Sequence, residues 1–276
     1  MCGRFVSYFD PAELAGVFDA DRITELPAPS WNVAPTNQVP MVRELAQATA
    51  PDSGPAAETL SGLGEDGSEA RAGRLGRQDP GPSHPRELRG ARWGLVPSWA
   101  KDPSIGSRLI NARSETITVK PSFRSAAKSR RALIPAAGYF EWQASGHGGK
   151  TPFFLHPEDE GIIAMAGLYE WWLPPSDPLV QSEDPSVRPE PLVTFTVVTR
   201  AATDSLGGIH DRMPLVVPPE LWEAWLSPDL NAPAAVNALI ESIPDPELIP
   251  REVSRAVGSV RNNGPHLINP AAGRLL

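Results

Sequence analysis

The chain has 276 residues, of which 41% are hydrophobic, and a formal net charge of −8 at pH 7. This apolar content suffices for a substantial core. No run approaches the about 18 apolar residues of a membrane span, and the N-terminus lacks the basic and apolar regions of a secretory signal. A single cysteine excludes an internal disulfide and a zinc site with several cysteine ligands. We therefore expect a soluble intracellular protein.

The charge is distributed unevenly along the chain. The stretches 44–88 and 173–191 carry net charges of −4 and −3, which leaves −1 for the other residues. Within that remainder, residues 92–131 hold nine Lys and Arg against two acidic residues, a net charge of +7. A basic segment of this kind is typical of a protein with a polyanionic partner, although it can also be a solvated basic face.

Cys2 directly follows the initiator Met1. A small second residue usually allows Met1 to be removed, which leaves a free α-amine and a thiol on one residue. Their reference pKa values of about 8 and about 8.5 leave both partly deprotonated near neutral pH. Such an aminothiol can attack an aldehyde with nitrogen and close a thiazolidine with sulfur, or it can use sulfur as an acyl nucleophile. The alternative is a frayed terminus with an incidental cysteine.

Three elements are expected near the N-terminus. Residues 3–8 alternate weakly and predict a strand, after which Asp10 and Pro11 predict the start of a short helix. A stretch punctuated by proline then leads to a strand at about 38–43. Asn32 in that stretch can be a turn residue or a group that orders the N-terminus.

The stretches 44–88 and 173–191 interrupt this pattern. They are rich in proline and acidic residues, and the first has no aromatic residue and no sustained period. We expect them to be disordered or flexible surface insertions in a single domain that spans 1–276, since long loops cost little closure entropy.

The basic segment contains Trp93 and Trp99 next to prolines. These side chains can belong to the core, or they can form a surface on which single-stranded nucleic acid stacks. Asn111 follows an apolar pair and can cap a helix. A further helix is expected from Pro121, with a basic outer face that extends to Arg131.

Residues 131–142 predict strand structure, and further strands are expected at about 152–156, 162–171 and 192–199. Glu141 lies among aromatic residues at the end of the first segment. If its carboxylate faces inward, burial would raise its pKa and suit it to proton transfer; if it faces outward, it is ordinary surface.

A long polar loop, residues 201–214, joins two apolar strands and carries His210 beside Asp211 and Arg212. This histidine is a better catalytic candidate than the other histidines, and a hydrogen-bonded loop histidine is the alternative. The last expected elements are helices from Pro218 and over 233–242 and a strand near 249–254.

Several common signatures are missing from the sequence. It has no phosphate-binding glycine loop, no cluster of metal ligands, no internal repeat and no GxSxG nucleophile motif. We therefore expect no metal and no cofactor.

A set of short motifs runs through the chain outside the two acidic stretches. The motifs are Met1-Cys2-Gly3-Arg4-Phe5, Trp31-Asn32-Val33-Ala34-Pro35-Thr36, Arg92-Trp93-Gly94-Leu95-Val96-Pro97-Ser98-Trp99, Asn111-Ala112-Arg113-Ser114-Glu115-Thr116, Gly138-Tyr139-Phe140-Glu141-Trp142, Ile209-His210-Asp211-Arg212-Met213-Pro214 and Val260-Arg261-Asn262-Asn263-Gly264-Pro265. Together they resemble the SRAP (SOS response-associated peptidase) family, whose members shield abasic sites in DNA by covalent crosslinking. Trp31 and Tyr139 differ from residues that many members have there.

The resemblance implies a fold and a reaction. The fold is a single α+β domain with an antiparallel, barrel-like sheet flanked by short helices. Cys2 would form a thiazolidine with the abasic aldehyde of single-stranded DNA. Asn111 would orient the sugar or the N-terminus, Glu141 would move protons, and His210 would assist opening of the sugar ring.

The resemblance also implies DNA contacts and side activities. Weak lyase activity at abasic sites and autoproteolytic removal of Met1 are expected. The protein would act as a monomer in the cytoplasm, in the nucleoid or in the nucleus. The residues implied in DNA binding are Arg4, Asn32, Trp93, Pro97, Ser98, Arg113 and Trp142.

Two other functions start from the same residues. An N-terminal-nucleophile glutamine amidotransferase also uses an activated cysteine after Met1, but it requires a glutamine pocket. A module that binds single-stranded DNA without any covalent step would use only the basic, aromatic segment. Glutamine hydrolysis and a denaturation-resistant DNA adduct discriminate these functions.

Overall fold

A computed structural model describes residues 2–45, 84–144, 148–175, 190–203 and 208–271. The strands are β1 (Arg4–Ser7), β2 (Ala20–Ile23), β3 (Ser30–Val33), β4 (Gln38–Glu44), β5 (Arg86–Trp93), β6 (Asn111–Arg113), β7 (Arg131–Ala136), β8 (Gly138–Ala144), β9 (Lys150–Pro157), β10 (Ile163–Trp172), β11 (Leu192–Ala201), β12 (Arg212–Pro214) and β13 (Leu248–Glu252). The helices are α1 (Pro11–Val17), α2 (Arg124–Ser129), α4 (Trp222–Leu226) and α5 (Pro233–Ser242), with 3₁₀ turns η1 (Pro103–Arg108), η2 (Ser114–Thr116), η3 (Pro219–Leu221), η4 (Arg255–Gly258) and η5 (Pro265–Ile268).

Five strands close into a barrel. β11, β10, β7, β4 and β5 pair in that order, and β5 also pairs with β11. This last pairing is parallel and short, with Thr194 opposite Arg92 and Phe195 opposite Trp93, whereas the other four are antiparallel. Alternate residues of these strands, among them Met41 and Phe195, form one buried cluster inside the barrel.

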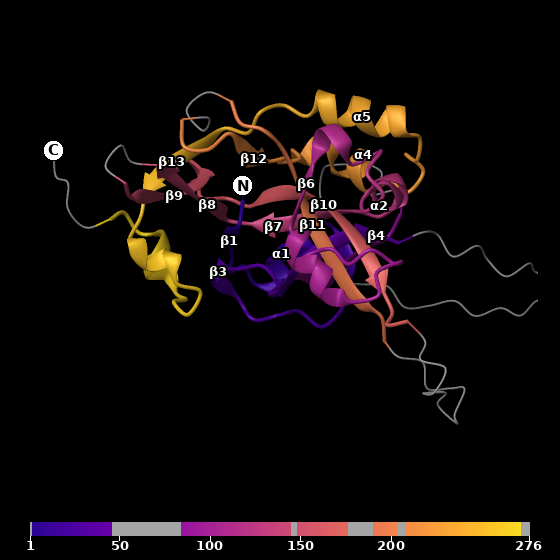
Figure 1. The fold of residues 1–276 in the computed structure, drawn as a ribbon, viewed down its shortest axis with the longest axis horizontal. Coiled ribbons are helices and arrows are strands. Elements are labelled where there is room, and N and C mark those ends of the chain that lie inside the picture. Colours follow the sequence, from indigo (N-terminus) through magenta and orange to yellow (C-terminus); the bar gives the residue numbers. More distant parts are fainter. Residues whose placement is uncertain (1, 46–83, 145–147, 176–189, 204–207, 272–276) are drawn as a thin grey trace, which may run out of the picture.

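A second sheet brings the N-terminus to the barrel. Its order is β13-β9-β8-β1-β3, and it is antiparallel throughout. Phe5 of β1 lies opposite Tyr139 of β8 and opposite Val33 of β3. The start of the chain therefore lies beside β8 in the middle of the molecule (Figure 1).

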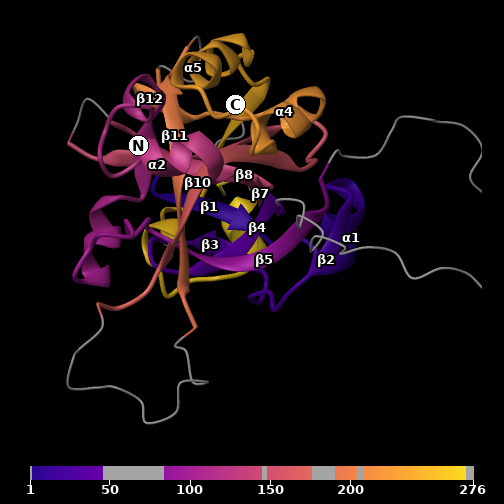
Figure 2. The same cartoon turned by 90° about the vertical axis from the view of Figure 1, so that its right-hand side faces the viewer.

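Short helices cover the outside of the barrel. α2, α4 and α5 lie together on one side, and α1 lies apart from them next to β2 (Figures 1 and 2). Their apolar residues Leu14, Ala126, Trp225 and Val236 join one large buried cluster with the outward-facing residues of the barrel strands. No helix in the described part of the chain is both long and apolar enough to cross a membrane.

The predicted fold class is confirmed, because the chain forms one α+β domain with a barrel-like, mainly antiparallel sheet and short flanking helices. The predicted start of the first helix is also confirmed, since Asp10 accepts a hydrogen bond from the backbone nitrogen of Ala12 at 2.8 Å and Pro11 is the first helical residue.

The predicted insertion 44–88 is too long at both ends. Glu44 is the last residue of β4, Arg86 is the first of β5, and the two lie opposite each other in the barrel. The charged start of β5 concealed the strand, because Arg86 and Glu87 are buried in spite of their charge. The remainder, 46–83, lies outside the described residues, as do 176–189 of the second stretch.

One further expectation and one alternative were wrong. Arg131 does not extend the basic outer face: it is buried and donates to the backbone carbonyls of Ala127, Trp225 and Ser227, which replace its hydration. Asn111 does not cap a helix, because it lies in β6 and the 3₁₀ turn that follows has no side-chain cap.

Candidate functional site

Cys2 is buried, and its backbone is held by Asn111. The Nδ2 of Asn111 donates to the carbonyl oxygen of Cys2 at 2.7 Å, and the thiol of Cys2 lies 3.9 Å from the carbonyl oxygen of Arg4. Asn111 is fixed in turn because β6 pairs with β11, with Asn111 opposite Val197. The interpretation of Cys2 as part of a frayed terminus is therefore wrong.

Glu141 faces inward, which was one of the two orientations that the sequence left open. It lies on β8 next to β1 and is buried. Burial raises the pKa of its carboxyl, and His210, when it is protonated, opposes that rise. Burial and then the negative charge of Glu141 raise the pKa of the Cys2 thiol. Glu141 therefore lies within electrostatic reach of both Cys2 and His210.

His210 lies in the loop before β12, and its ring contacts the two residues that follow it. The Nδ1 of His210 lies 3.0 Å from the backbone nitrogen of Arg212, from which it can accept a hydrogen bond when the ring proton is on Nε2. Asp211 lies 2.8 Å from the same Nδ1, and this contact becomes an ion pair when the imidazole is protonated. The loop is also attached to β8, because Gln143 donates to the carbonyl oxygen of Gly208 at 2.9 Å.

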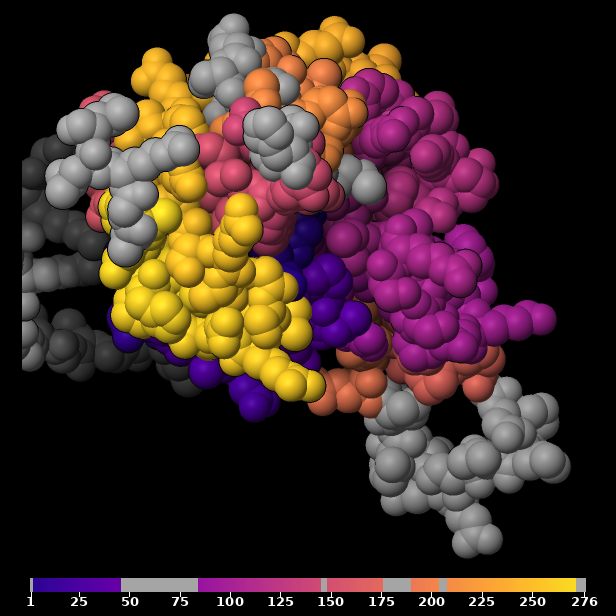
Figure 3. Space-filling view, turned by 60° about the vertical axis from the view of Figure 1, so that its left-hand side comes forward, coloured from indigo at the N-terminus to yellow at the C-terminus, as the bar shows by residue number. Residues whose placement is uncertain are grey.

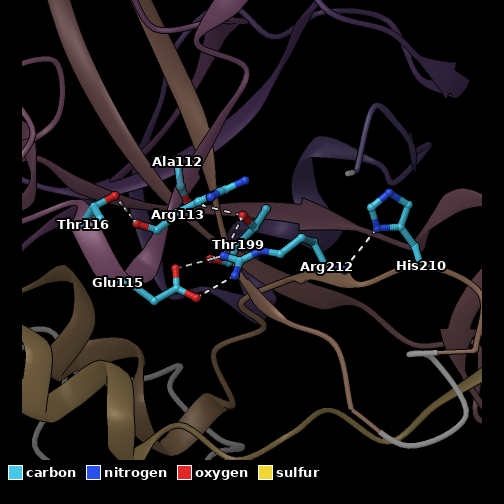
Figure 4. A network of polar contacts seen from close by, with 7 residues as sticks. All are labelled: Ala112, Arg113, Glu115, Thr116, Thr199, His210 and Arg212. Carbon is cyan, nitrogen blue, oxygen red and sulfur yellow. Dashed lines mark hydrogen bonds and ion pairs between the residues drawn. The ribbon is translucent and has the colours of Figure 1, made fainter.

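Arg212 connects this loop to the segment that follows Asn111 (Figure 4). Its guanidinium binds both carboxylate oxygens of Glu115, at 2.5 and 3.0 Å, and donates to the carbonyl oxygen of Thr199 at 2.6 Å. Sequence reasoning missed this role of Arg212 and Glu115, because partners 97 residues apart have no spacing that can be recognised in advance.

Arg4 and Asn32 bind backbone carbonyls of residues 257–262, which we call the C-terminal segment. Arg4 donates to the Oδ1 of Asn32 at 2.8 Å and to the carbonyl oxygen of Val257 at 2.9 Å. The Nδ2 of Asn32 donates to the carbonyls of Ser259 and Asn262 at 3.0 and 2.9 Å. Asn32 lies in β3, so the alternative of a turn residue is wrong. The other alternative fits, because Asn32 accepts from Arg4 close to the N-terminus.

The residues implied in DNA binding differ in exposure. Trp93 is fully buried, and its indole nitrogen donates to the carbonyl oxygen of Ile110 at 2.8 Å, so it belongs to the core and cannot stack on a base. Pro97 is buried, Trp142 is half-buried, and Ser98 and Arg113 are exposed. The exposed tryptophan is instead Trp99, at 59%.

Figure 3 shows the N-terminal residues at the bottom of a hollow between the C-terminal segment and the basic segment. On the basic side, Trp99, Lys101 and Arg108 line a pocket of about 380 Å³. The exposed cations of residues 92–131 are Lys101, Arg108, Arg113, Lys120, Arg124 and Lys128. Among the residues that the structure describes, no three His, Cys, Asp or Glu side chains gather as metal ligands would.

Fold and site together define a single-domain α+β protein whose buried Cys2 lies near the carboxyl group of Glu141, which in turn lies near His210. The model of the SRAP family, "SOS response associated peptidase", matches residues 1–260, and the chain belongs to this family.

Relatives from bacteria and animals match over different lengths. "Abasic site processing protein YoqW" of Bacillus subtilis is 32% identical over 272 residues, which cover 97% of this chain and 99% of that protein. "Abasic site processing protein YedK" of Escherichia coli is 35% identical over 179 residues, which cover 64% of this chain and 72% of that protein. "Abasic site processing protein HMCES" of Gallus gallus is 33% identical over 216 residues, with 70% and 60% covered.

A solved structure shares the fold. The crystal structure of a protein from Bacteroides thetaiotaomicron superposes with a TM-score of 0.66 at 22% identity, and the match covers 98% of this chain and 100% of that chain.

Proposed function

We propose that this protein processes abasic sites in single-stranded DNA by linking itself covalently to them through Cys2. The observation that carries the proposal is the hydrogen bond from Asn111 to the carbonyl oxygen of Cys2. This bond keeps Cys2 near the buried Glu141. The names of the relatives, abasic site processing proteins, support the same substrate.

The reaction starts once Met1 has been removed, by an aminopeptidase or by the protein itself. The α-amine of Cys2 adds to the C1′ aldehyde of the opened sugar, and loss of water gives an imine. The thiol then adds to the imine carbon and its proton passes to nitrogen, so that a thiazolidine forms and one water is released overall. Because the imine is consumed, β-elimination and strand cleavage are suppressed, and only weak lyase activity remains.

Glu141 serves this sequence because burial raises the pKa of its carboxyl. A protonated carboxyl can supply the proton that the departing water needs, and the resulting carboxylate can take the proton of the thiol. When its proton is on Nε2, neutral His210 can donate to the sugar oxygen as the ring opens or closes. Glu141 connects the two roles, because it lies within electrostatic reach of both Cys2 and His210.

The DNA strand would lie in the hollow between the basic and the C-terminal segments. Arg113 and the other exposed cations would contact phosphates, which makes binding depend on salt. Trp99 would stack on a base, with Ser98 and Trp142 along the path. Arg4 and Asn32 would shape the opposite wall through the C-terminal segment.

Intact mass measurement tests the proposal. Wild-type protein mixed with an oligonucleotide containing one abasic site should give a chain without Met1 plus the mass of the DNA less one water. The adduct should survive denaturation. Cys2→Ala should give no such species, and Cys2→Ser should lose the stable ring.

Two other outcomes would contradict the covalent function. A native-gel shift without any adduct would leave a DNA-binding module. Release of ammonia from glutamine, without any adduct, would instead support the amidotransferase. If Cys2→Ala crosslinks as well as wild type, the mechanism is wrong.

A further inference from the structure

Tyr139 is a buried ionisable residue that has no role in the reaction proposed above. It lies on β8 opposite Phe5 of β1 and is 1% exposed. Successive side chains of a strand point to opposite faces of the sheet, so Tyr139 and Glu141, two residues apart on β8, point to the same face. The ring of Tyr139 therefore lies on the face that carries the carboxyl of the candidate site.

Cys2 packs on this same face. One buried cluster contains Cys2, Phe5 and Tyr139, whereas Phe140, the next residue of β8, belongs to a different cluster. The division into clusters confirms the alternation along β8, and it places the phenol and the thiol in one apolar environment. A hydrogen bond formed in such an environment is stronger than in water, because the local dielectric constant is low.

The hydroxyl of Tyr139 keeps its proton. Burial first, and then the negative charges that Cys2 and Glu141 carry when they are ionised, raise the pKa of this hydroxyl. The hydroxyl therefore lies within electrostatic reach of both groups. A neutral phenol can donate a hydrogen bond, and a buried tyrosine hydroxyl usually has a partner. The ionised thiol and the ionised carboxyl are the two acceptors within this reach.

The sulfur gains more from such a donor than the carboxyl does. Burial and the charge of Glu141 raise the pKa of the Cys2 thiol, so formation of the thiolate is costly at neutral pH. A hydrogen bond to a charged group contributes more than one to a neutral group. A phenol that donates to the sulfur therefore favours the thiolate over the thiol, which is the change that ring closure requires.

We propose that Tyr139 is a further catalytic residue, whose hydroxyl donates a hydrogen bond to the sulfur of Cys2 while the thiazolidine closes. The proposal rests on the covalent function proposed above. In this step the thiol proton passes to the carboxylate of Glu141, and the sulfur forms a bond with the imine carbon. The electron pair of the C=N π bond moves to nitrogen, which takes the proton from Glu141. The O–H bond of Tyr139 stays intact, and no atom is oxidised or reduced.

Tyr139→Phe tests the proposal, because it removes the hydroxyl and keeps the ring. The imine and thiazolidine adducts have the same mass, but a brief borohydride quench reduces only the imine, so intact mass then separates them. With the full chain and an oligonucleotide containing one abasic site, total adduct should form at the wild-type rate, since the amine acts first. Ring closure should slow about tenfold, as expected for loss of a hydrogen bond to a charged group. The reduced imine and the strand cleavage that proceeds through it should therefore increase.

Tyr169→Phe is the matched control. Tyr169 is buried in the same cluster, but its hydroxyl accepts a hydrogen bond from Arg43 at 3.4 Å. This variant should give the wild-type ratio of imine to thiazolidine. Urea unfolding should show that both variants are folded under the conditions of the assay.

Three results would overturn the role of Tyr139. Equal fractions of reduced imine in Tyr139→Phe and wild type would remove this role and leave the covalent function intact. An equal decrease of imine and thiazolidine in Tyr139→Phe would show that the hydroxyl only supports the fold. Absence of any adduct with wild-type protein would overturn the covalent function, and the role of Tyr139 with it.

Discussion

Asn111→Ala tests whether the N-terminus is positioned by one side chain. The variant removes the 2.7 Å hydrogen bond to the carbonyl of Cys2. Such a bond contributes about 0.5–1.5 kcal/mol net, and a carbonyl at the chain end can hydrate after release, so the unfolding free energy should fall by about 1 kcal/mol. The reaction should suffer more, because the aminothiol is no longer held beside Glu141. We expect crosslinking to slow at least tenfold, equivalent to about 1.4 kcal/mol of activation free energy.

The assay is single-turnover crosslinking with protein in excess over an abasic oligonucleotide, resolved on denaturing gels and paired with urea unfolding. Asn237→Ala is the matched control. It also removes one asparagine side chain and one hydrogen bond, the 3.2 Å contact with Thr118, but it lies on α5 at the surface. It should crosslink at the wild-type rate.

Crosslinking of Asn111→Ala within about twofold of wild type would refute the reasoning, since twofold corresponds to only about 0.4 kcal/mol. Cys2 would then be positioned by its strand alone. Slow crosslinking by Asn237→Ala would show instead that the loss follows from general destabilisation.

Glu141→Gln should slow crosslinking yet raise the unfolding free energy at neutral pH. Burial raises the Glu141 pKa, so the folded chain binds more protons than the unfolded chain, and wild type loses stability as the pH rises above about 4.3. This expectation would be contradicted if the unfolding free energies of variant and wild type, measured in urea, changed with pH in the same way. Arg131→Ala should cost about 3 kcal/mol or more, because several buried carbonyls lose their donor, and a loss below about 1 kcal/mol in urea would contradict the burial argument. Trp93→Ala should cost about 3–5 kcal/mol of stability. Trp99→Ala should leave stability unchanged and weaken single-stranded DNA binding by about 1–3 kcal/mol in a fluorescence titration.

The residues proposed to carry the chemistry could be selected from the sequence because they carry local signals. Cys2 is the single cysteine beside the initiator, Glu141 is a carboxylate among strand-forming aromatic residues, and His210 lies in a polar loop between apolar strands. Each signal is contained within a few residues. The structure brings Glu141 into electrostatic reach of both Cys2 and His210.

The supporting contacts could not be predicted, because they join distant parts of the chain. Arg4 binds the carbonyl of Val257 across 253 residues, and no property of a five-residue motif indicates that its arginine faces a backbone carbonyl rather than a phosphate. The same ambiguity affected Trp93 and Trp99, since a tryptophan next to arginine and proline suits both core and surface. Only the closure of β5 onto β11 determines which of the two is enclosed.

Burial of Cys2 bears on the order of events in the proposed reaction. A thiol whose pKa is raised by burial and by Glu141 is largely protonated at neutral pH, so it is a poor first nucleophile. The amine has a larger deprotonated fraction at neutral pH, since its reference pKa is about 8. If the amine attacks first, the product is an imine carbon next to the thiol, and proton transfer to Glu141 then releases the thiolate where its electrophile already lies. A buried, protonated thiol thus fits ring closure after imine formation, in which the thiol acts second.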